Sequence, residues 1–196
     1  MDNFKTYLKN KTNLPDEELH QLTHQLSSRK FEKGKFLLSK GDICQFSFFV
    51  EQGLLRSFTI DETGKEHIIQ FGSEDWIVSD LSSVFFNEPS ELYIEAIETT
   101  TVTLLDKHFM AHASELSASF RQYNEKALQN HIRHLQKRIN LLLGASADKR
   151  YLDFIKLYPD LTMRVPQWMI ASYLGITPES LSRVRKELAR NNFKPH

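Results

Sequence analysis

The sequence predicts an α+β fold: an N-terminal antiparallel β-roll, a long helix and a small C-terminal helical domain. Three observations support this order. Short β-branched and aromatic runs alternate with glycines up to Leu105, a heptad pattern without proline or glycine follows, and two short helices joined at a glycine come last. Because 196 residues suffice for two small domains, we expect the roll and long helix at 1–143 and the helical domain at 144–196.

The composition is that of a globular chain, with 40% apolar and 26% charged residues. The net charge is zero, but residues 1–143 carry 16 Lys and Arg against 20 Asp and Glu, whereas 144–196 carry 9 against 5. A basic C-terminal domain favours an anionic partner there. The sequence has neither a run of about 18 apolar residues nor a signal-peptide pattern, so we expect a cytoplasmic protein with no membrane partner.

The single cysteine, Cys44, cannot form an internal disulfide or supply the four thiolates of a typical iron–sulfur cluster. We expect it to be a small buried apolar residue.

The N-terminal part has one helical pattern followed by strand patterns. Leu19, Leu22 and Leu26 repeat at spacings of three and four after Pro15, which predicts a short amphipathic helix over 15–26. The expected strands are apolar or aromatic runs, including those at 46–50, 54–60, 67–71 and 93–97. The segment Asp61–Gly64 is typical of a hairpin turn between two of them.

Apolar residues between Asp106 and Leu143 repeat with the spacing of a coiled-coil seam. Steps of four and three alternate along Leu128, Ile132, Leu135, Ile139 and Leu142. Such a narrow stripe is buried best against a copy of itself, so we expect a parallel homodimer through a dimerisation helix at about 106–143. The alternative, in which the stripe packs on the chain's own core, stays open. Residues 144–148 then predict a hinge, with Ser146 or Asp148 as the cap of the next helix.

The segment from Gln167 to Lys186 has the spacing of a helix-turn-helix. Ala171 is small where two helices would approach closely, and Gly175 can adopt the positive φ of a tight turn. Thr177 is expected to cap the second helix, and Pro178 suits its first position because its missing N–H leaves nothing unpaired. The shared core is expected to be apolar, made of Ile170, Leu174, Ile176, Leu181 and Val184.

The second helix, at about 178–190, would turn polar side chains away from that core and towards a DNA groove. Arg183 can pair bidentately with guanine, Glu179 can accept from the cytosine amino group, and Ser182 can bond a base or a phosphate. The expected DNA-binding residues are Thr177, Pro178, Glu179, Ser182, Arg183, Arg185, Lys186 and Arg190, with Arg185, Lys186 and Arg190 suited to phosphate. The alternative is an ordinary helical hairpin with a solvated charged face.

Over nearly its whole length the chain resembles regulators of the Crp/Fnr family. Residues 31–42, 49–53 and 64–66 resemble the β-roll of cyclic-nucleotide-binding domains, and the heptad helix resembles the family's dimerisation helix. Glu179-x-x-Ser182-Arg183 resembles the base-reading motif of the fumarate–nitrate regulator branch, while 173–185 resembles regulators common in Bacteroidetes. The resemblance implies a homodimeric transcriptional regulator that binds palindromic double-stranded DNA and acts with RNA polymerase.

Two stretches depart from the family pattern. Nucleotide-binding members carry an arginine near the end of the phosphate cassette, but the corresponding residues 76–93 contain none. A cyclic phosphate would meet the carboxylates of Asp80, Glu88 or Glu91, so we do not expect cyclic AMP to bind. The candidate pocket for an unidentified effector comprises Trp76, Ser79, Asp80, Ser82, Ser83, Ser90, Glu91 and Tyr93. At 191–196 the β-hairpin wing of the family is expected to be reduced or absent.

Other function classes have less support from the sequence. His108 with His112, and His131 with His134, have the spacing of metal ligands on a helix, but third and fourth ligands are not evident, so we expect no metal or other cofactor. The motifs Gly-x-Ser-x-Gly, His-Glu-x-x-His and the Walker loop are absent, so we expect no enzyme. The rival hypothesis is a sensory or interaction module with a ligand-binding roll that has lost DNA binding. The intact reading helix favours the regulator.

Overall fold

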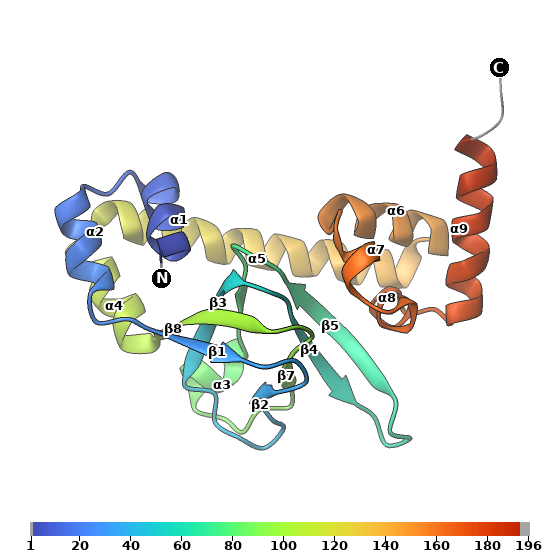
Figure 1. Ribbon diagram of the computed structural model, residues 1–196, viewed down its shortest axis with the longest axis horizontal. Helices are drawn as coiled ribbons and strands as arrows, with labels where there is room; N and C mark the ends of the chain where they lie inside the picture. The colour runs from blue at the N-terminus through green and yellow to red at the C-terminus, as the bar shows by residue number, and fades with distance from the viewer. Residues whose placement is uncertain (1, 193–196) are drawn as a thin grey trace. The chain divides into compact units, whose positions relative to one another are not determined.

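The computed structural model describes residues 2–192 (Figure 1). Its contacts divide the chain into two compact units, Met1–Thr59 with Ile69–Gln129, and Ile60–Ile68 with Asn130–His196. The first unit contains the β-roll, and the second contains the C-terminal helices and the tip of one hairpin. Within the described part of the chain, no helix has the length and apolar character needed to span a membrane.

The first unit is a roll of two four-stranded sheets, with strand orders β1–β8–β3–β6 and β2–β7–β4–β5. The pairs β1–β8, β3–β8, β3–β6, β2–β7 and β4–β7 are antiparallel. The predicted strands correspond to β3, β4, β5 and β7, which confirms the expected roll. The strands are β1 (Ser27–Phe31), β2 (Phe36–Leu38), β3 (Phe46–Gln52), β4 (Leu55–Ile60), β5 (Glu66–Gly72), β6 (Ile77–Val78), β7 (Tyr93–Ala96) and β8 (Thr100–Asp106).

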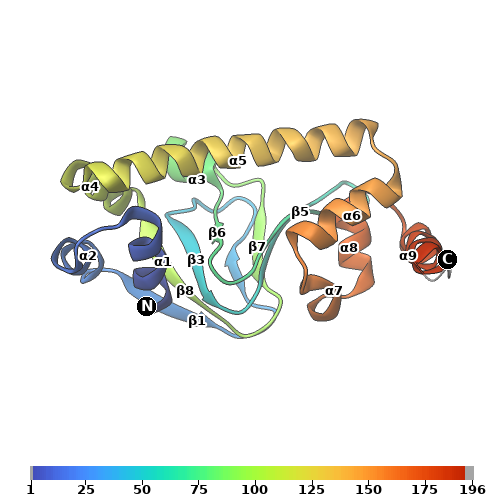
Figure 2. The same cartoon turned by 90° about the horizontal axis from the view of Figure 1, so that it is seen from above.

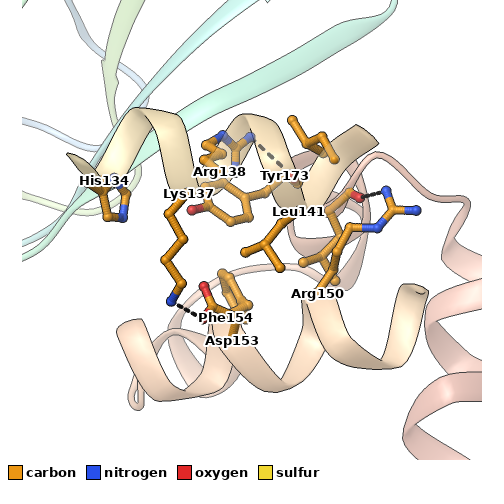
Figure 3. Close-up of a pocket in the computed structure, with 10 residues that line it drawn as sticks. His134, Lys137, Arg138, Leu141, Arg150, Asp153, Phe154 and Tyr173 are labelled. Atoms are coloured by element: carbon orange, nitrogen blue, oxygen red, sulfur yellow. Dashed lines mark hydrogen bonds and ion pairs between the residues drawn. The ribbon is translucent and has the colours of Figure 1, made fainter. Parts of the chain in front are cut away.

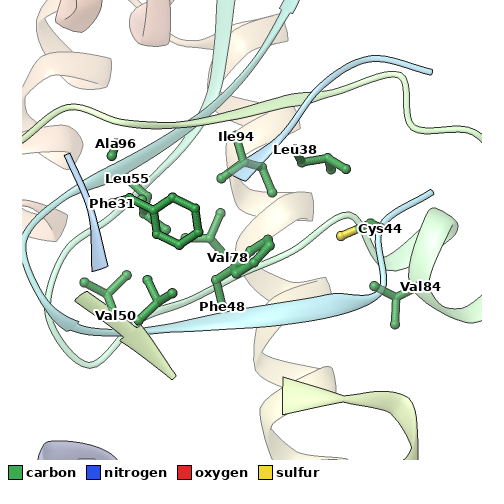
Figure 4. Close-up of a cluster of buried hydrophobic side chains, with 11 residues drawn as sticks. Phe31, Leu38, Cys44, Phe48, Val50, Leu55, Val78, Val84, Ile94 and Ala96 are labelled. Carbon is green, nitrogen blue, oxygen red and sulfur yellow. The ribbon is translucent and has the colours of Figure 1, made fainter. Parts of the chain in front are cut away.

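Apolar side chains from both sheets form the core of the roll (Figure 4). Phe48 and Val50 of β3, like Ile94 and Ala96 of β7, are two residues apart and at most 4% exposed, as expected where alternate residues of a strand face one side. Burying a Val, Ile or Phe side chain fully stabilises the fold by about 1.5 to 3 kcal/mol. Cys44 belongs to this cluster at 3% exposure, so the prediction of a buried apolar cysteine is confirmed, and burial raises the pKa of its thiol.

Short helices pack on β3 and β8 and form a second apolar cluster (Figure 2). They are α1 (Asp2–Thr12), α2 (Asp16–Thr23) and α4 (Lys107–Leu116). The predicted helix at 15–26 is α2, whereas α1 had no predicted counterpart. Only Phe4 and Leu8 of α1 are buried apolar residues, and two positions are too few to set a helical period.

The helix predicted over about 106–143 is two helices, α4 and α5 (Ala118–Gly144). Ser117 separates them in an extended conformation, with φ −131° and ψ 119°. Its hydroxyl oxygen accepts from the Phe120 N–H, which caps the start of α5. A serine can therefore end one helix and begin the next where neither proline nor glycine marks the break.

The second unit contains the C-terminal part of α5 followed by α6 (Ala147–Leu157), α7 (Leu161–Arg164), α8 (Gln167–Leu174) and α9 (Pro178–Asn192). The rings of Phe154, Tyr158 and Tyr173 pack together, with centroid separations of 5.4 to 5.7 Å. Ser146 caps α6 by accepting from the Lys149 N–H, so of the two predicted caps Ser146 is the one used.

α5 ends at Gly144, whereas the division of the chain into two units falls within this helix, between Gln129 and Asn130. Residues 60–68, which include the turn after β4, group with the C-terminal helices rather than with the roll. The turn itself is as predicted, because the Gly64 N–H donates to the Asp61 carbonyl oxygen and the Asp61 N–H to that of Lys65. The assignment of 1–143 and 144–196 to separate functional domains stays a prediction.

Candidate nucleic-acid interface and effector region

The turn between α8 and α9 has the predicted geometry. Gly175 adopts φ +65° and ψ 37°, a left-handed conformation that a residue without a Cβ reaches at little cost. Its N–H donates to the carbonyl oxygens of Ala171 and Ser172, and the Ile176 N–H donates to that of Ala171. Ala171 is 1% exposed, which agrees with its predicted place at the close approach of the two helices.

Two arginines hold the end of α8, and neither contact has a local sequence signal (Figure 3). The Arg138 Nη2 donates to the Tyr173 carbonyl oxygen at 3.0 Å, and the Arg150 Nη1 donates to that of Leu174 at 2.7 Å. The last carbonyls of a helix have no partner within it, and they carry partial negative charge that a cation stabilises. Arg138 and Arg150 line a cavity of about 20 Å³, enough for one water molecule.

The start of α9 is capped as predicted. The Thr177 hydroxyl oxygen accepts from the Ser180 N–H at 3.2 Å, and Pro178 occupies the first helical position. Residues Leu181 and Val184 are 0% and 5% exposed, so they anchor α9 in the core of the second unit. The cap and the two anchors together fix which side of α9 faces outward.

The outward side of α9 brings together the predicted reading residues. Glu179, Ser182, Arg183 and Lys186 are exposed, and steps of three and four place them on one helix face. Thr177, Pro178 and Arg190 are exposed as well, whereas Arg185 is half-buried beside this face. Hydrogen bonds from its own backbone N–H and from the Thr177 hydroxyl lower the pKa of Glu179.

The predicted effector region contains a buried hydrogen-bond network around Asp80. The Asp80 carboxylate accepts from the Ser83 N–H at 3.2 Å and from the Ser90 hydroxyl at 2.7 Å, which caps helix α3 (Leu81–Phe86). The Ser83 hydroxyl oxygen in turn accepts from the Cys44 N–H at 2.7 Å. Asp80, Ser83 and Ser90 are at most 7% exposed. These polar groups therefore satisfy one another inside the roll.

The remaining residues of the predicted effector pocket are engaged elsewhere. The Ser47 hydroxyl donates to the Ser79 oxygen, and the Ser82 hydroxyl to the Glu88 carboxylate. Glu91 forms an exposed ion pair with Lys40 at 2.9 Å. Tyr93 stacks on Phe58 with centroids 5.2 Å apart, and Trp76 is half-buried after β5.

A cavity of about 460 Å³ lies at another part of the roll. It is lined by residues of β1, β2, β3 and β8 and of the turn after β2: Arg29, Phe31, Leu37, Leu38, Asp42, Ile43, Cys44, Gln45, Phe46, Phe48 and Leu104. None of the eight predicted pocket residues is among them. The sequence therefore did not indicate where the roll is hollow.

The roll also contains a buried ion pair between Arg56 and Glu95 that was not predicted. The Arg56 Nε donates to Glu95 Oε2 at 2.7 Å, and the guanidinium lies 4.1 Å from the centre of the Phe58 ring. The Arg56 and Glu95 side chains are 6% and 17% exposed. The two residues face each other across β4 and β7, a pairing that follows from strand register and has no local sequence signal.

The heptad residues of α5 are exposed in the single chain. Their exposed fractions are 43% for Leu128, 56% for Ile132, 39% for Leu135, 54% for Ile139 and 39% for Leu142. Each of the five residues is thus partly covered and partly exposed within the described residues, and the homodimer through this stripe stays a prediction.

The four histidines considered as metal ligands lie on α4 (His108 and His112) and α5 (His131 and His134). Burial lowers the pKa of His131, and burial followed by the charge of His131 lowers that of His134. Among residues 2–192, no group of three or more His, Cys, Asp and Glu side chains has the arrangement of a metal site. The predicted reduction of the wing concerns 191–196, and residues 193–196 lie outside the described part of the chain.

Comparison with known proteins gives relatives along nearly the whole chain. Residues 28–115 match the family model of the cyclic nucleotide-binding domain. The anaerobic regulatory protein of Pasteurella multocida is 26% identical over 189 residues, covering 90% of this chain and 68% of that protein. The fumarate and nitrate reduction regulatory protein of Vibrio cholerae is 26% identical over 183 residues, covering 87% and 72%.

Solved structures share the fold. FixK2 from Bradyrhizobium japonicum has a TM-score of 0.72 at 20% identity, covering 87% of this chain and 88% of that chain. The catabolite activator protein of Thermus thermophilus has a TM-score of 0.58 at 19% identity, covering 96% and 91%. The likeness to regulators of Bacteroidetes stays a prediction. Residues 28–115 thus match the cyclic nucleotide-binding domain, and along nearly its whole length the chain is similar to bacterial regulatory proteins of the Crp/Fnr type.

Proposed function

We propose that this protein is a DNA-binding transcriptional regulator of the Crp/Fnr type that reads the major groove with α9. The observation that carries the proposal is the exposed face of α9, with Glu179, Ser182 and Arg183 at steps of three and four on a capped and anchored helix. The names of the relatives support the same function, and they are regulators rather than enzymes.

The chemistry of this face assigns a role to each side chain. Arg183 donates two hydrogen bonds to a guanine, Glu179 accepts from a cytosine amino group, and Ser182 bonds a base or a phosphate. The hydrogen bonds that lower the pKa of Glu179 come from the start of α9 itself. Lys186, Arg190 and the half-buried Arg185 contact phosphates, which give affinity without sequence preference. Thr177 and Pro178 set the start of the helix at the groove.

The active form in this proposal is a homodimer joined through the α5 seam. The support is the exposure of five heptad residues, each at least 39% in the single chain. Burying such a stripe against its copy removes apolar surface from water and places two α9 helices on successive half-sites, about 34 Å apart. The target is therefore a palindrome in double-stranded DNA, the further partner is RNA polymerase, and the regulator acts in the cytoplasm.

The roll in this proposal senses a signal other than cyclic AMP or serves as a scaffold. In the cassette region a cyclic phosphate would meet the Asp80 carboxylate. The Ser83 N–H and the Ser90 hydroxyl hold this carboxylate in place by hydrogen bonds. A phosphate placed there would lack an arginine partner and face a buried negative charge. Calorimetry with cyclic AMP and cyclic GMP tests this, and micromolar binding of either would contradict it.

Selection of bound fragments from genomic DNA tests the proposed function itself. The full-length protein should enrich a palindromic motif at a fixed salt concentration, because phosphate contacts make affinity depend on salt. The rival hypothesis, a sensory or interaction module without DNA binding, predicts that no motif is enriched. Failure to recover a motif both with and without cell extract would contradict the regulator.

A further inference from the structure

The outer edge of β5 is bonded by two helices instead of by another strand. β5 is the last strand of its sheet, so one side of its backbone has no strand beside it. In an antiparallel strand the N–H and C=O of one residue point to the same side of the strand. The N–H and C=O of the residue two positions later point to that side as well. The Glu66 carbonyl and the Ile68 N–H and carbonyl fall on one side, and side chains of α8 and α5 bond all three.

Ser172 of α8 makes two of these bonds with one hydroxyl. It donates to the Glu66 carbonyl oxygen at 2.8 Å and accepts from the Ile68 N–H at 3.0 Å. Arg138 of α5 donates from one nitrogen to the carbonyl oxygens of both Ile68 and Tyr173, each at 3.0 Å. We call Glu66, Ile68, Arg138 and Ser172 the β5 latch. All four residues belong to the second unit.

The latch links α8 to the hairpin at a partly buried place: Ile68 is buried, and Glu66, Arg138 and Ser172 are half-buried. Ile68 is 2% exposed, and a buried backbone group left without a partner is unfavourable. The Arg138 guanidinium also lies 3.6 Å from the centre of the Tyr173 ring, so the residue after Ser172 is held by the same arginine. Because only the short turn at Gly175 separates α8 from α9, the position of α8 determines the position of α9.

The latched arrangement does not cover the reading face. Glu179, Ser182 and Arg183 are exposed in the same structure in which Ser172 holds β5. Ser172 lies on α8, outside the set of side chains that would meet bases. The latch therefore acts on the position of the reading helix and does not block it.

We infer that Ser172 is a positioning residue for DNA reading, which holds α8 and thereby α9 on the hairpin at 60–68 through the β5 latch. The inference rests on the proposed function. Because β5 continues from Glu66 to Gly72, a shift of this strand changes the bonds at Ser172 and Arg138 directly. The hairpin thus sets the affinity of the protein for its specific site without contacting DNA.

Affinity measurements on full-length variants test the inference. Ser172→Ala removes the hydroxyl, Ser172→Thr keeps it, and Met163→Ala is a matched control because Met163 is 91% exposed in the same unit. We expect Ser172→Ala to weaken binding to the selected palindrome by about three- to tenfold, equivalent to the net value of about one hydrogen bond. Ser172→Thr and Met163→Ala should stay within about twofold of the wild type, and affinity for random DNA should not change.

Amide hydrogen exchange gives an independent readout of the latch. In Ser172→Ala the peptide covering 66–72 should exchange faster than in the wild type at 25 °C, while peptides of α9 remain protected. Faster exchange with unchanged affinity for the palindrome would contradict the inference and reduce Ser172 to a structural role. Wild-type protein that selects no sequence would instead contradict the proposed function on which the inference rests.

Discussion

The guanidinium carbon of Arg138 lies 3.6 Å from the centre of the Tyr173 ring, and the same side chain donates to the Tyr173 carbonyl oxygen. Arg138 comes from α5 and Tyr173 from α8, 35 residues later. The aromatic face stabilises the cation through a cation–π interaction, and the negative end of the helix dipole stabilises it as well. The turn that orients the reading helix therefore depends on a side chain outside the helix-turn-helix motif.

Replacement of Arg138 with leucine should destabilise the second unit. The substitution removes the stack on Tyr173 and leaves the carbonyl oxygens of Ile68 and Tyr173 without their arginine donor, a loss of about 2 to 4 kcal/mol. Urea unfolding at one fixed protein concentration measures it. The exposed Arg133 of the same helix supplies the control, because Arg133→Leu changes the same charge. Equal effects of the two substitutions would refute the assignment.

Replacement of Ile139 with aspartate should convert the proposed homodimer into monomers. Ile139 is 54% exposed in the single chain. In the proposed dimer each of the two chains would bury one charge at this position of the seam. Light scattering after size-exclusion chromatography should give the mass of one chain, against two for the wild type. Asn140→Asp adds the same charge beside the seam and should leave the dimer intact. A monomeric wild type would show that the seam has another role.

Replacement of Asp80 with alanine should disturb the cassette region of the roll. The Ser83 N–H and the Ser90 hydroxyl would lose their shared acceptor in a buried setting, at a cost of about 1 to 3 kcal/mol. Glu88→Ala is the control, because Glu88 is exposed and accepts a hydrogen bond from Ser82, which is exposed too. Chemical denaturation measures both variants, and an unchanged midpoint for Asp80→Ala would rule out the network as a stabilising feature.

The hairpin at 60–68 should lose stability in acid. Hydrogen bonds from His67, from the Thr63 hydroxyl and from the Lys65 N–H hold the pKa of Asp61 well below its usual value of 3.8. A carboxyl with a lowered folded pKa stabilises the fold above its unfolded pKa, and this contribution is lost as the pH falls below that value. The free energy of unfolding of the wild type minus that of Asp61→Asn should therefore shrink as the pH falls from about 5 to about 2. A difference independent of pH would contradict this origin.

Features set by neighbours along the chain could be predicted from the sequence. The turn at Gly175, the cap at Thr177 and the strands β3, β4, β5 and β7 each follow from residue type and spacing within a few positions. The reading face of α9 follows for the same reason, since Leu181 and Val184 fix its orientation. The break at Ser117 is local too, but serine occurs in many settings and gives no distinct signal.

Features set by distant pairing could not be predicted. Ser172 bonds Glu66 across 106 positions, Arg150 bonds Leu174 across 24, and Arg56 meets Glu95 across 39. Each pairing depends on how whole helices and strands pack together. The sequence alone does not distinguish an arginine that bonds a distant backbone group from one that is exposed to solvent. The same reason explains why the eight predicted effector residues do not line the cavity in the roll.

The most direct test of DNA reading compares motif selection by the wild type and by Arg183→Ala. Loss of a bidentate contact to guanine should cost about 1 to 3 kcal/mol on the specific site and relax one base pair in each half-site. Lys186→Ala, the control for a phosphate contact, should weaken all sequences alike. We predict a palindrome with half-sites one helical turn apart for the wild type and the same palindrome, degenerate at one position, for Arg183→Ala. An identical motif for both proteins, with equal losses on specific and random DNA, would contradict the assignment of α9 as the reading helix.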